Sequence, residues 1–340
     1  MRECDNELDK DKGSDQGAFS GAPRREVDLT TRLGALVLRN PVITASGTYG
    51  FGEEYAAYCS PTSLGAITVK GITPLPRLGN PVPRLAETPA GLLNSVGLEN
   101  PGLEEFINSY LPKLATLDTA VIVNISGFSL EDYALMASAL EKHSGHKSGD
   151  NNAPGRKIAA LEVNISCPNI KHGGMAFGTN PKSAQEVVQA VKQNTTLPVI
   201  AKLSPNVTDI AEMAQAVAAG GADIISLINT ILGMSIDIRT QKPLLANKMG
   251  GLSGPAVRPI AVRMVYQVYE AVDLPLIGMG GIATWEDAVQ FMLAGASAVS
   301  IGTANFVNPM APLDILNGLE DYCRQRGYHS VQEIVGLAHA

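Results

Sequence analysis

The sequence predicts an α/β domain with the fold of a TIM (β/α)8 barrel, and three observations point to it. Eight short, nearly continuous apolar segments recur along the chain, as expected of strands buried on both faces of a parallel sheet. Helical patterns fill the gaps between these segments. Polar residues end nearly every strand, which favours a barrel with one shared mouth over a doubly wound open sheet.

The elements follow in chain order. Residues 1–26 are polar, alternate in charge sign and contain no apolar stretch, so we expect a disordered tail without a signal or anchor helix. Residues 27–340 are expected to form the domain, and residues 27–38 predict a hairpin that covers the bottom of the barrel. The predicted strands are residues 41–46, 65–70, 120–126, 159–166, 197–204, 222–229, 274–280 and 296–302.

Helices are predicted over residues 181–193 and 208–219. Another begins after Thr284, which suits an N-cap, with Asp287 at the capping-box position. Residues 143–155 have the composition of a surface insertion, because periodic apolar segments resume on both sides of them.

Composition excludes several classes of function. The chain has 340 residues, is 45% hydrophobic and 17% charged, and carries a net charge of −7, with its 26 basic residues scattered. This pattern is typical of a soluble globular protein, and argues against nucleic-acid binding and against a membrane protein. The four cysteines form no CxxC pair, so we expect neither a disulfide framework nor a zinc site nor an iron-sulfur cluster bound by this chain. We infer a reducing cytosol.

The segment with the most chemical information is Asn164 to Asn169, which places the thiol of Cys167 at the end of a predicted strand. A lone cysteine is more often core packing than catalyst. Its polar neighbours Asn164, Ser166 and Asn169 favour the opposite conclusion, since burying an unpaired amide costs about 1 to 3 kcal/mol. Strand ends are also where α/β barrels keep their chemistry. We therefore predict a proton-transfer site.

Two lysines predict an anionic ligand. Lys70 and Lys202 each close an apolar strand, where an unpaired ammonium is costly to bury. Snorkelling to solvent at the barrel rim is the alternative, common for one lysine and less so for two at equivalent positions. A substrate carboxylate and the negative charge of a reduced flavin ring would satisfy both lysines.

Glycine turns follow the last two strands, at Gly280-Gly281 and at Gly302-Thr303. Barrels commonly bind phosphate at these two positions, although tight turns need glycine whether or not a ligand is present. Because two such turns lie on adjacent strands, a cofactor with a phosphate group is favoured.

Together these motifs resemble the class 1 dihydroorotate dehydrogenases, most closely the class 1B catalytic subunit, from about Val27 to the C-terminus. The resemblance rests on residues 45–47, 94–98, 164–169, 202–205, 228–230 and 250–254 and on the two glycine turns. It implies FMN as the cofactor and dihydroorotate and orotate as substrate and product. The FMN contacts that it implies are Ser46, Lys70, Gly71, Asn124, Asn164, Lys202, Ile228, Gly254, Gly280, Gly281, Gly302 and Thr303.

The resemblance also implies a substrate site and a base. Lys202 would face the N1/O2 edge of the flavin, and Cys167 would take the C5 proton of dihydroorotate while the C6 hydride passes to flavin N5. A free thiol has a pKa of about 8.5, so activity is expected to rise with alkalinity. The substrate contacts implied are Lys70, Asn94, Ser95, Val96, Gly97, Leu98, Asn164, Asn169, Asn229 and Thr230.

Residues 170–179, with their paired glycines, are expected to form a lid. His172 lies in this segment, and we place it outside the core site. The tail and the insertion depart from the family pattern.

The electron acceptor follows from the class. Class 1B enzymes pair the FMN subunit with a chain that carries FAD and an iron-sulfur cluster and pass electrons to NAD, which implies a dimer of this chain within a heterotetramer. A class 1A homodimer that reduces fumarate remains open, as do a dihydropyrimidine dehydrogenase-type barrel and a non-catalytic phosphate-binding barrel. The quinone-linked class 2 is disfavoured, because it uses a serine base and a membrane-binding helix.

Overall fold

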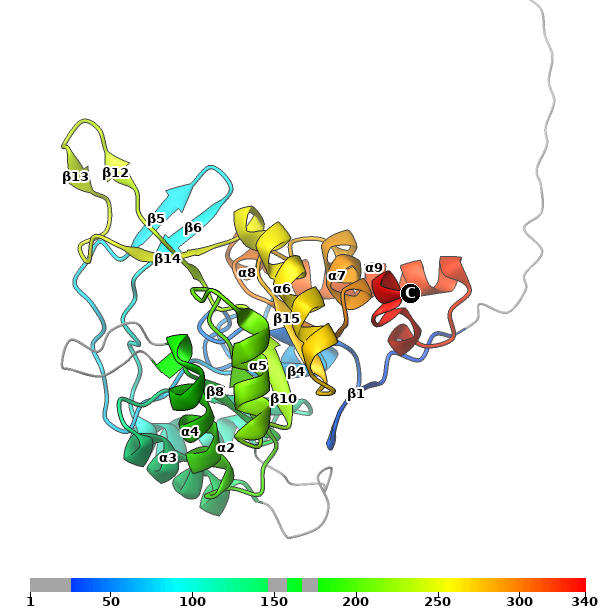
Figure 1. The fold of residues 1–340 in the computed structure, drawn as a ribbon, viewed down its shortest axis with the longest axis horizontal. Coiled ribbons are helices and arrows are strands. Elements are labelled where there is room, and N and C mark those ends of the chain that lie inside the picture. The colour runs from blue at the N-terminus through cyan, green and yellow to red at the C-terminus, as the bar shows by residue number, and fades with distance from the viewer. Residues whose placement is uncertain (1–25, 146–157, 167–176) are drawn as a thin grey trace, which may run out of the picture.

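The computed structural model describes residues 26–145, 158–166 and 177–340 and contains a closed barrel of eight parallel strands (Figure 1). The last strand pairs with the first, with Val299 beside Val42, which closes the ring. Each strand lies within one of the predicted segments, so the predicted barrel is confirmed. The strands are β3 (Val42–Thr44), β4 (Ala66–Thr68), β7 (Ala120–Ile125), β8 (Ala160–Asn164), β9 (Val199–Lys202), β10 (Ile224–Leu227), β15 (Leu276–Met279) and β16 (Ala296–Ile301).

Helices surround the barrel: α3 (Leu130–His143), α4 (Pro181–Lys192), α5 (Ile210–Ala219), α6 (Arg258–Ala271), α7 (Trp285–Leu293) and α9 (Ala311–Arg326). Shorter segments are α1 (Leu103–Glu105), a π-helical turn (Phe106–Tyr110), α2 (Leu111–Leu114) and α8 (Ala304–Val307). The predicted start of α7 is confirmed, because Thr284 and Asp287 form a capping box. Among the described residues, no helix is long and apolar enough to cross a bilayer.

The first gap of the barrel differs from the expectation that helices fill every gap. Between β3 and β4 the chain forms only a 3-10 turn, Pro61–Ser63, and irregular loop. Tyr49 in this loop is 1% exposed and its ring stacks on that of Tyr55 at 5.3 Å. Tyr49 belongs to the main hydrophobic core and Tyr55 packs against it, so this loop contributes to the core without a helix.

The N-terminal hairpin closes the bottom of the barrel, as predicted. Strands β1 (Thr31–Leu33) and β2 (Leu36–Leu38) pair antiparallel around a turn in which Gly34 has a φ of 61°. Leu33, Leu36 and Leu38 are at most 2% exposed. They pack against residues that the strands direct inward, namely Ile43, Ala66, Ile122, Ala160, Ile200, Ile224, Ile277 and Ala298. The barrel interior is therefore solid at this end.

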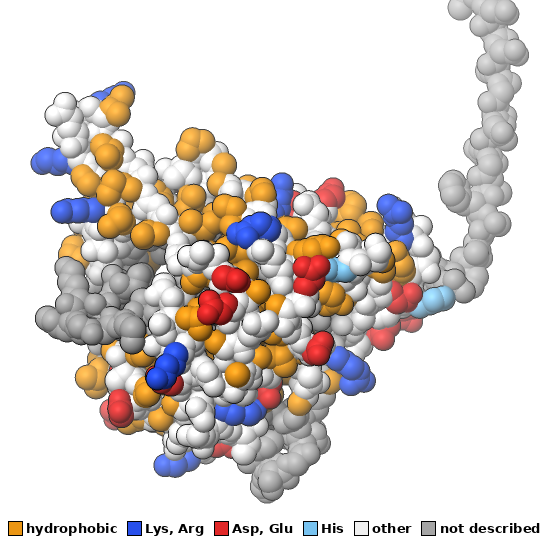
Figure 2. Space-filling model, in the orientation of Figure 1, with side chains coloured by type: hydrophobic (Ala, Val, Ile, Leu, Met, Phe, Trp, Pro, Cys, Tyr) orange, Lys and Arg blue, Asp and Glu red, His pale blue; other side chains and the backbone are white. Residues whose placement is uncertain are grey.

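A second, small sheet stands over the opposite end of the barrel (Figure 1). It contains β5 (Leu85–Thr88), β6 (Gly91–Asn94), β11 (Ile231–Gly233) and β14 (Gly250–Ser253), in the order β11-β14-β6-β5. A hairpin of β12 (Ile236–Asp237) and β13 (Lys242–Pro243) projects beside it. Figure 2 shows hydrophobic side chains exposed over these projections, with basic side chains among them. The sheet joins the loops after β4 and after β10.

Candidate active site

A cavity of about 1390 Å³ opens at the C-terminal ends of the barrel strands, beneath the small sheet. It brings together most of the residues that the sequence singled out. Those that line it are Ser46, Lys70, Gly71, Asn94, Ser95, Val96, Gly97, Leu98, Asn124, Asn164, Lys202, Ile228, Asn229, Thr230, Gly280, Gly281, Gly302 and Thr303. The structure thus places one site at the predicted mouth.

Among the predicted residues that the structure describes, Gly254 does not line the cavity. Gly254 lies just behind its wall, between Ser253 and Pro255, and a Cβ there would come within 2.7 Å of Gly91 Cα. Cys167 and Asn169 lie outside the described residues, as does most of the predicted lid, so their roles stay predictions.

Lys202, the last residue of β9, is 6% exposed and faces a carboxylate that sequence reasoning missed. Its Nζ lies 3.7 Å from Oε2 of Glu162, which is 2% exposed in the middle of β8. Asn124 Nδ2 donates to the same oxygen at 2.6 Å, and Ser226 Oγ donates to Oε1 at 2.8 Å. The sequence contains an indication of this buried carboxylate, because a glutamate interrupts the apolar segment of residues 160–163.

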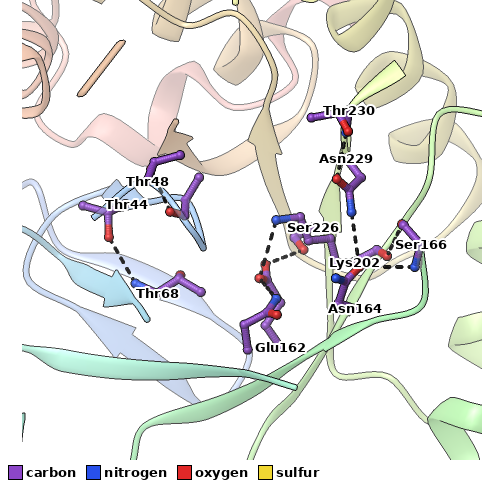
Figure 3. Close-up of polar contacts among 12 residues, drawn as sticks. Thr44, Thr48, Thr68, Glu162, Asn164, Ser166, Lys202, Ser226, Asn229 and Thr230 are labelled. Carbon is purple, nitrogen blue, oxygen red and sulfur yellow. Dashed lines mark hydrogen bonds and ion pairs between the residues drawn. The ribbon is translucent and has the colours of Figure 1, made fainter. Parts of the chain in front are cut away.

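Amide groups line the cavity next to this pair (Figure 3). Asn164 Oδ1 accepts from Asn229 Nδ2 and from the backbone N–H of Ser166, both at 3.2 Å. Asn229 Oδ1 in turn accepts from the Thr230 N–H at 2.8 Å. These contacts fix the orientation of both amides. A ligand ring with alternating C=O and N–H groups suits such a surface, since an amide both donates and accepts.

Lys70 supplies a second cation to the cavity. It follows β4 by two residues, a small departure from the predicted strand end, and its backbone N–H donates to Gly50 O at 3.1 Å. Within the described ranges its ammonium makes neither an ion pair nor a hydrogen bond. The side chain is half-buried, so its charge is available to an anionic group in the cavity.

The turn from Ser95 to Leu98 forms one wall and is held rigidly. Gly97 and Leu98 have positive φ values of 79° and 57°. Asn80 Nδ2 donates to Ser95 O at 3.0 Å, and Asn100 Nδ2 donates to Leu98 O at 2.7 Å. Asn80 and Asn100 were not predicted. They flank the motif in sequence, and their role depends on a turn geometry that the sequence does not reveal.

The two glycine turns form the far end of the cavity. Gly280 and Gly281 have φ values of 125° and 83°, which side chains rarely adopt. A Cβ on Gly302 would meet only Ala45 and Thr48, at 3.5 and 3.9 Å. Exposed backbone beside the Thr303 hydroxyl is the donor chemistry that a phosphate needs, and lysines and amides at the other end suit a flavin ring. The residues present therefore fit FMN.

Two cysteines of the described part lie away from the cavity. Burial raises the pKa of the Cys59 thiol above its ordinary value, and burial together with Glu333 raises that of Cys323 to about 11. Both are packed in the core, as lone cysteines commonly are. In the described ranges no group of three or more His, Cys, Asp or Glu side chains is placed to hold a metal ion.

Comparisons with known proteins agree on one family. The family model described as Dihydroorotate dehydrogenase matches residues 28–323. Two relatives carry the name dihydroorotate dehydrogenase B (NAD(+)), catalytic subunit. That of Desulforamulus reducens is 55% identical over 314 residues, 92% of this chain and 99% of the relative. That of Bacteroides fragilis is 52% identical over 309 residues, 91% and 98% of the two chains. A crystal structure of DHODH from Eimeria tenella in complex with ferulenol is similar in fold, with a TM-score of 0.74, 21% identity and coverage of 93% and 90%.

Proposed function

The chain belongs to the dihydroorotate dehydrogenase family, and from this premise we propose that it is the catalytic subunit of an NAD-linked dihydroorotate dehydrogenase. Its reaction is the flavin-dependent oxidation of (S)-dihydroorotate to orotate in de novo UMP synthesis, in the cytoplasm. The observation that supports this most directly is a cavity that brings together the two lysines, four of the predicted asparagines and the rigid turn of residues 95–98. The lysines and asparagines are Lys70, Lys202, Asn94, Asn124, Asn164 and Asn229.

FMN would lie between the strand-end polar groups and the glycine turns, held by Ser46, Gly71, Asn124, Lys202, Ile228, Gly254, Gly280, Gly281, Gly302 and Thr303. When bound, FMN accepts the C6 hydride of the substrate at N5. Lys202 would place a fixed positive charge at the N1/O2 edge, where negative charge would develop.

Dihydroorotate would be bound by groups that match its edges. The ammonium of Lys70 and the backbone N–H groups of residues 96–98 take the carboxylate, since the N–H of Ser95 already donates to Arg84 O. Asn94, Asn164, Asn169 and Asn229, with Thr230, take the ring, since amides can satisfy both C=O and N–H groups. Because hydrogen bonds already orient Asn164 and Asn229, the ring is positioned without further ordering of those side chains.

Cys167 is the proposed base that takes the C5 proton. The thiolate is the reactive form of cysteine, so turnover should rise with pH toward the ordinary thiol pKa of about 8.5. Cys167→Ala should keep its yellow colour and lose most of its turnover. Cys323→Ala is the matched control, because that thiol is on the buried face of α9, outside the cavity, and the turnover of this variant should stay close to wild type. Wild-type turnover in Cys167→Ala would contradict the assignment.

We propose that electrons leave through a partner subunit that carries FAD and an iron-sulfur cluster, in a heterotetramer built on a dimer of this chain. The word "subunit" in the relatives' names supports a partner. So does the exposed apolar surface on the projecting loops, where Leu78 is 93% and Ile238 is 88% exposed. Light scattering of the isolated chain should give the mass of a dimer, and a monomer would contradict the proposed assembly.

An anaerobic titration tests the function as a whole. The purified chain should be yellow, and dihydroorotate should bleach it. Bleaching by dihydrouracil instead would favour a dihydropyrimidine dehydrogenase-like activity, and a colourless protein would favour a phosphate-binding barrel. Reoxidation of the bleached chain by fumarate would favour the class 1A alternative, whereas NAD should reoxidise it only when the partner subunit is present.

A further inference from the structure

The carboxylate of Glu162 stands directly behind the ammonium of Lys202, on the side away from the cavity. Lys202 lines the cavity and Glu162 does not, yet Nζ and Oε2 are 3.7 Å apart. The side chains of both residues are almost fully buried, at 8% and 3% exposure. A charge pair with so little water around it interacts more strongly than one at the surface.

Two other barrel strands hold this carboxylate in place (Figure 3). Asn124 on β7 donates to one oxygen and Ser226 on β10 donates to the other, at 2.6 and 2.8 Å. Glu162 itself pairs with Asn124 in the β7–β8 register, and Asn164 pairs with Lys202 in the β8–β9 register. All of these groups sit on barrel strands, so the carboxylate cannot swing away from the lysine.

The separation leaves the ammonium available to a ligand. At 3.7 Å the pair is ionic without a hydrogen bond, and in the described part of the chain Lys202 Nζ donates to no acceptor. Its N–H groups are free to point into the cavity. Lys202 is therefore attracted by a fixed negative charge on one side and by a ligand on the other.

We propose that Glu162 is a positioning residue that sets how strongly Lys202 stabilises negative charge on the bound cofactor. This inference rests on the proposed function, in which Lys202 faces the N1/O2 edge of FMN. The fixed carboxylate opposes the arrival of negative charge on the flavin, and so makes the bound flavin harder to reduce and a better donor to the next carrier. The alternative is that Glu162 only neutralises a buried lysine for the sake of the fold.

The test is the midpoint potential of FMN in the purified holoprotein, measured anaerobically against a redox dye. Glu162→Gln removes the charge and keeps the shape. Its amide oxygen can accept from Asn124, and its NH2 group can donate to the hydroxyl oxygen of Ser226. We expect the equilibrium constant for reduction to rise at least about tenfold, because a unit charge buried directly behind Lys202 is only weakly screened from a ligand that contacts this lysine. Tenfold corresponds to about 30 mV in a two-electron couple.

Two control variants separate this effect from a general loss of charge. Asp223→Asn removes a carboxylate from another lysine pair, with Lys192 at 2.6 Å, but at the start of β10 near the closed end of the barrel. Its potential should equal that of wild type. Glu162→Asp keeps the charge near the lysine, and its equilibrium constant should stay within about threefold of wild type. A purely structural role would leave all of these potentials alike.

An unchanged or lowered potential in yellow Glu162→Gln would overturn the proposal while the proposed function stands. A colourless wild-type protein would overturn both. If Glu162→Gln alone fails to bind FMN, the charge pair is tested instead by urea denaturation of two variants without FMN. The double variant Glu162→Gln/Lys202→Met should resist urea better than Lys202→Met, which leaves a buried carboxylate without its cation. A double variant no more resistant than Lys202→Met would overturn the pairing.

Discussion

Asn100 holds the turn from Ser95 to Leu98, which we propose binds the substrate, and its removal should weaken both the fold and ligand binding. The residue is 6% exposed and uses both ends of its amide. Oδ1 accepts from the backbone N–H groups of Thr73 at 3.1 Å and Gly102 at 2.9 Å. Nδ2 donates to Thr73 Oγ1 at 2.8 Å and to Leu98 O at 2.7 Å. One side chain thus joins three backbone segments.

The magnitude follows from the groups that Asn100→Ala leaves without partners. Two buried N–H groups lose their acceptor, at about 1 to 3 kcal/mol each, so we expect about 3 kcal/mol less free energy of unfolding. Leu98, at a φ of 57°, loses the bond that holds it in a strained conformation. A non-glycine residue in that region is strained by about 1 kcal/mol or more, enough to weaken orotate binding roughly fivefold or more if the turn relaxes.

Urea denaturation measures the first effect, and the change of flavin absorbance on adding orotate measures the second. Asn194→Ala is the matched control, because the side chain of Asn194 is exposed on the outside of the barrel and its amide donates a hydrogen bond to Ala190 O. It should change both quantities little. If Asn100→Ala unfolds within about 1 kcal/mol of wild type and binds orotate as tightly, the described network does not hold the turn.

Four further predictions concern other parts of the molecule. Leu36→Ala opens a cavity at the closed end of the barrel, so urea denaturation should show a free energy of unfolding lower by about 2 to 5 kcal/mol. Leu135→Ala is the control, because Leu135 is 55% exposed, and it should lower the free energy of unfolding by less than about 0.5 kcal/mol. Lys70→Met should raise the KM for dihydroorotate at least about tenfold in steady-state assays, since it removes the unpaired cation proposed for the carboxylate, and an unchanged KM would refute that role. Alkylation of the folded protein at pH 8, read by mass spectrometry, should spare Cys59 and Cys323, whose raised pKa values keep them as thiols. The pKa of Cys323 is about 11 in the folded protein, against 9.0 for an unperturbed thiol. Its contribution to the free energy of unfolding is therefore complete below pH 9 and is lost as the pH rises toward 11. Urea denaturation across that pH range should show this loss.

The barrel could be predicted because its strands carry a local signal. Strands that are buried on both faces consist of apolar residues, so each can be recognised without its neighbours. The three-residue spacing of Thr284 and Asp287 likewise predicts the start of a helix. The hairpin of residues 27–38 was equally local. Because each of these elements depends mainly on its own residues, the sequence is sufficient to predict it.

The small sheet and the charge pair could not be predicted in the same way. Strand β14 pairs with β6, more than 150 residues earlier, and neither segment is apolar enough to be recognised alone. Glu162 looks like an isolated polar residue until the barrel brings Asn124, Lys202 and Ser226 around it. Contacts of this kind depend on closure of the whole ring, so they appear only in three dimensions.

The first and last described segments meet on the side of the barrel that the hairpin seals. Asp28 forms a parallel bridge with Ser330, and Gln332 donates to Ser297 O at the start of β16. His339 reaches Ala294 O in the same region. A purification tag or fluorescent protein fused after Ala340 would therefore sit across the molecule from the opening through which small molecules enter. Immobilisation through that end would leave the opening facing the solution.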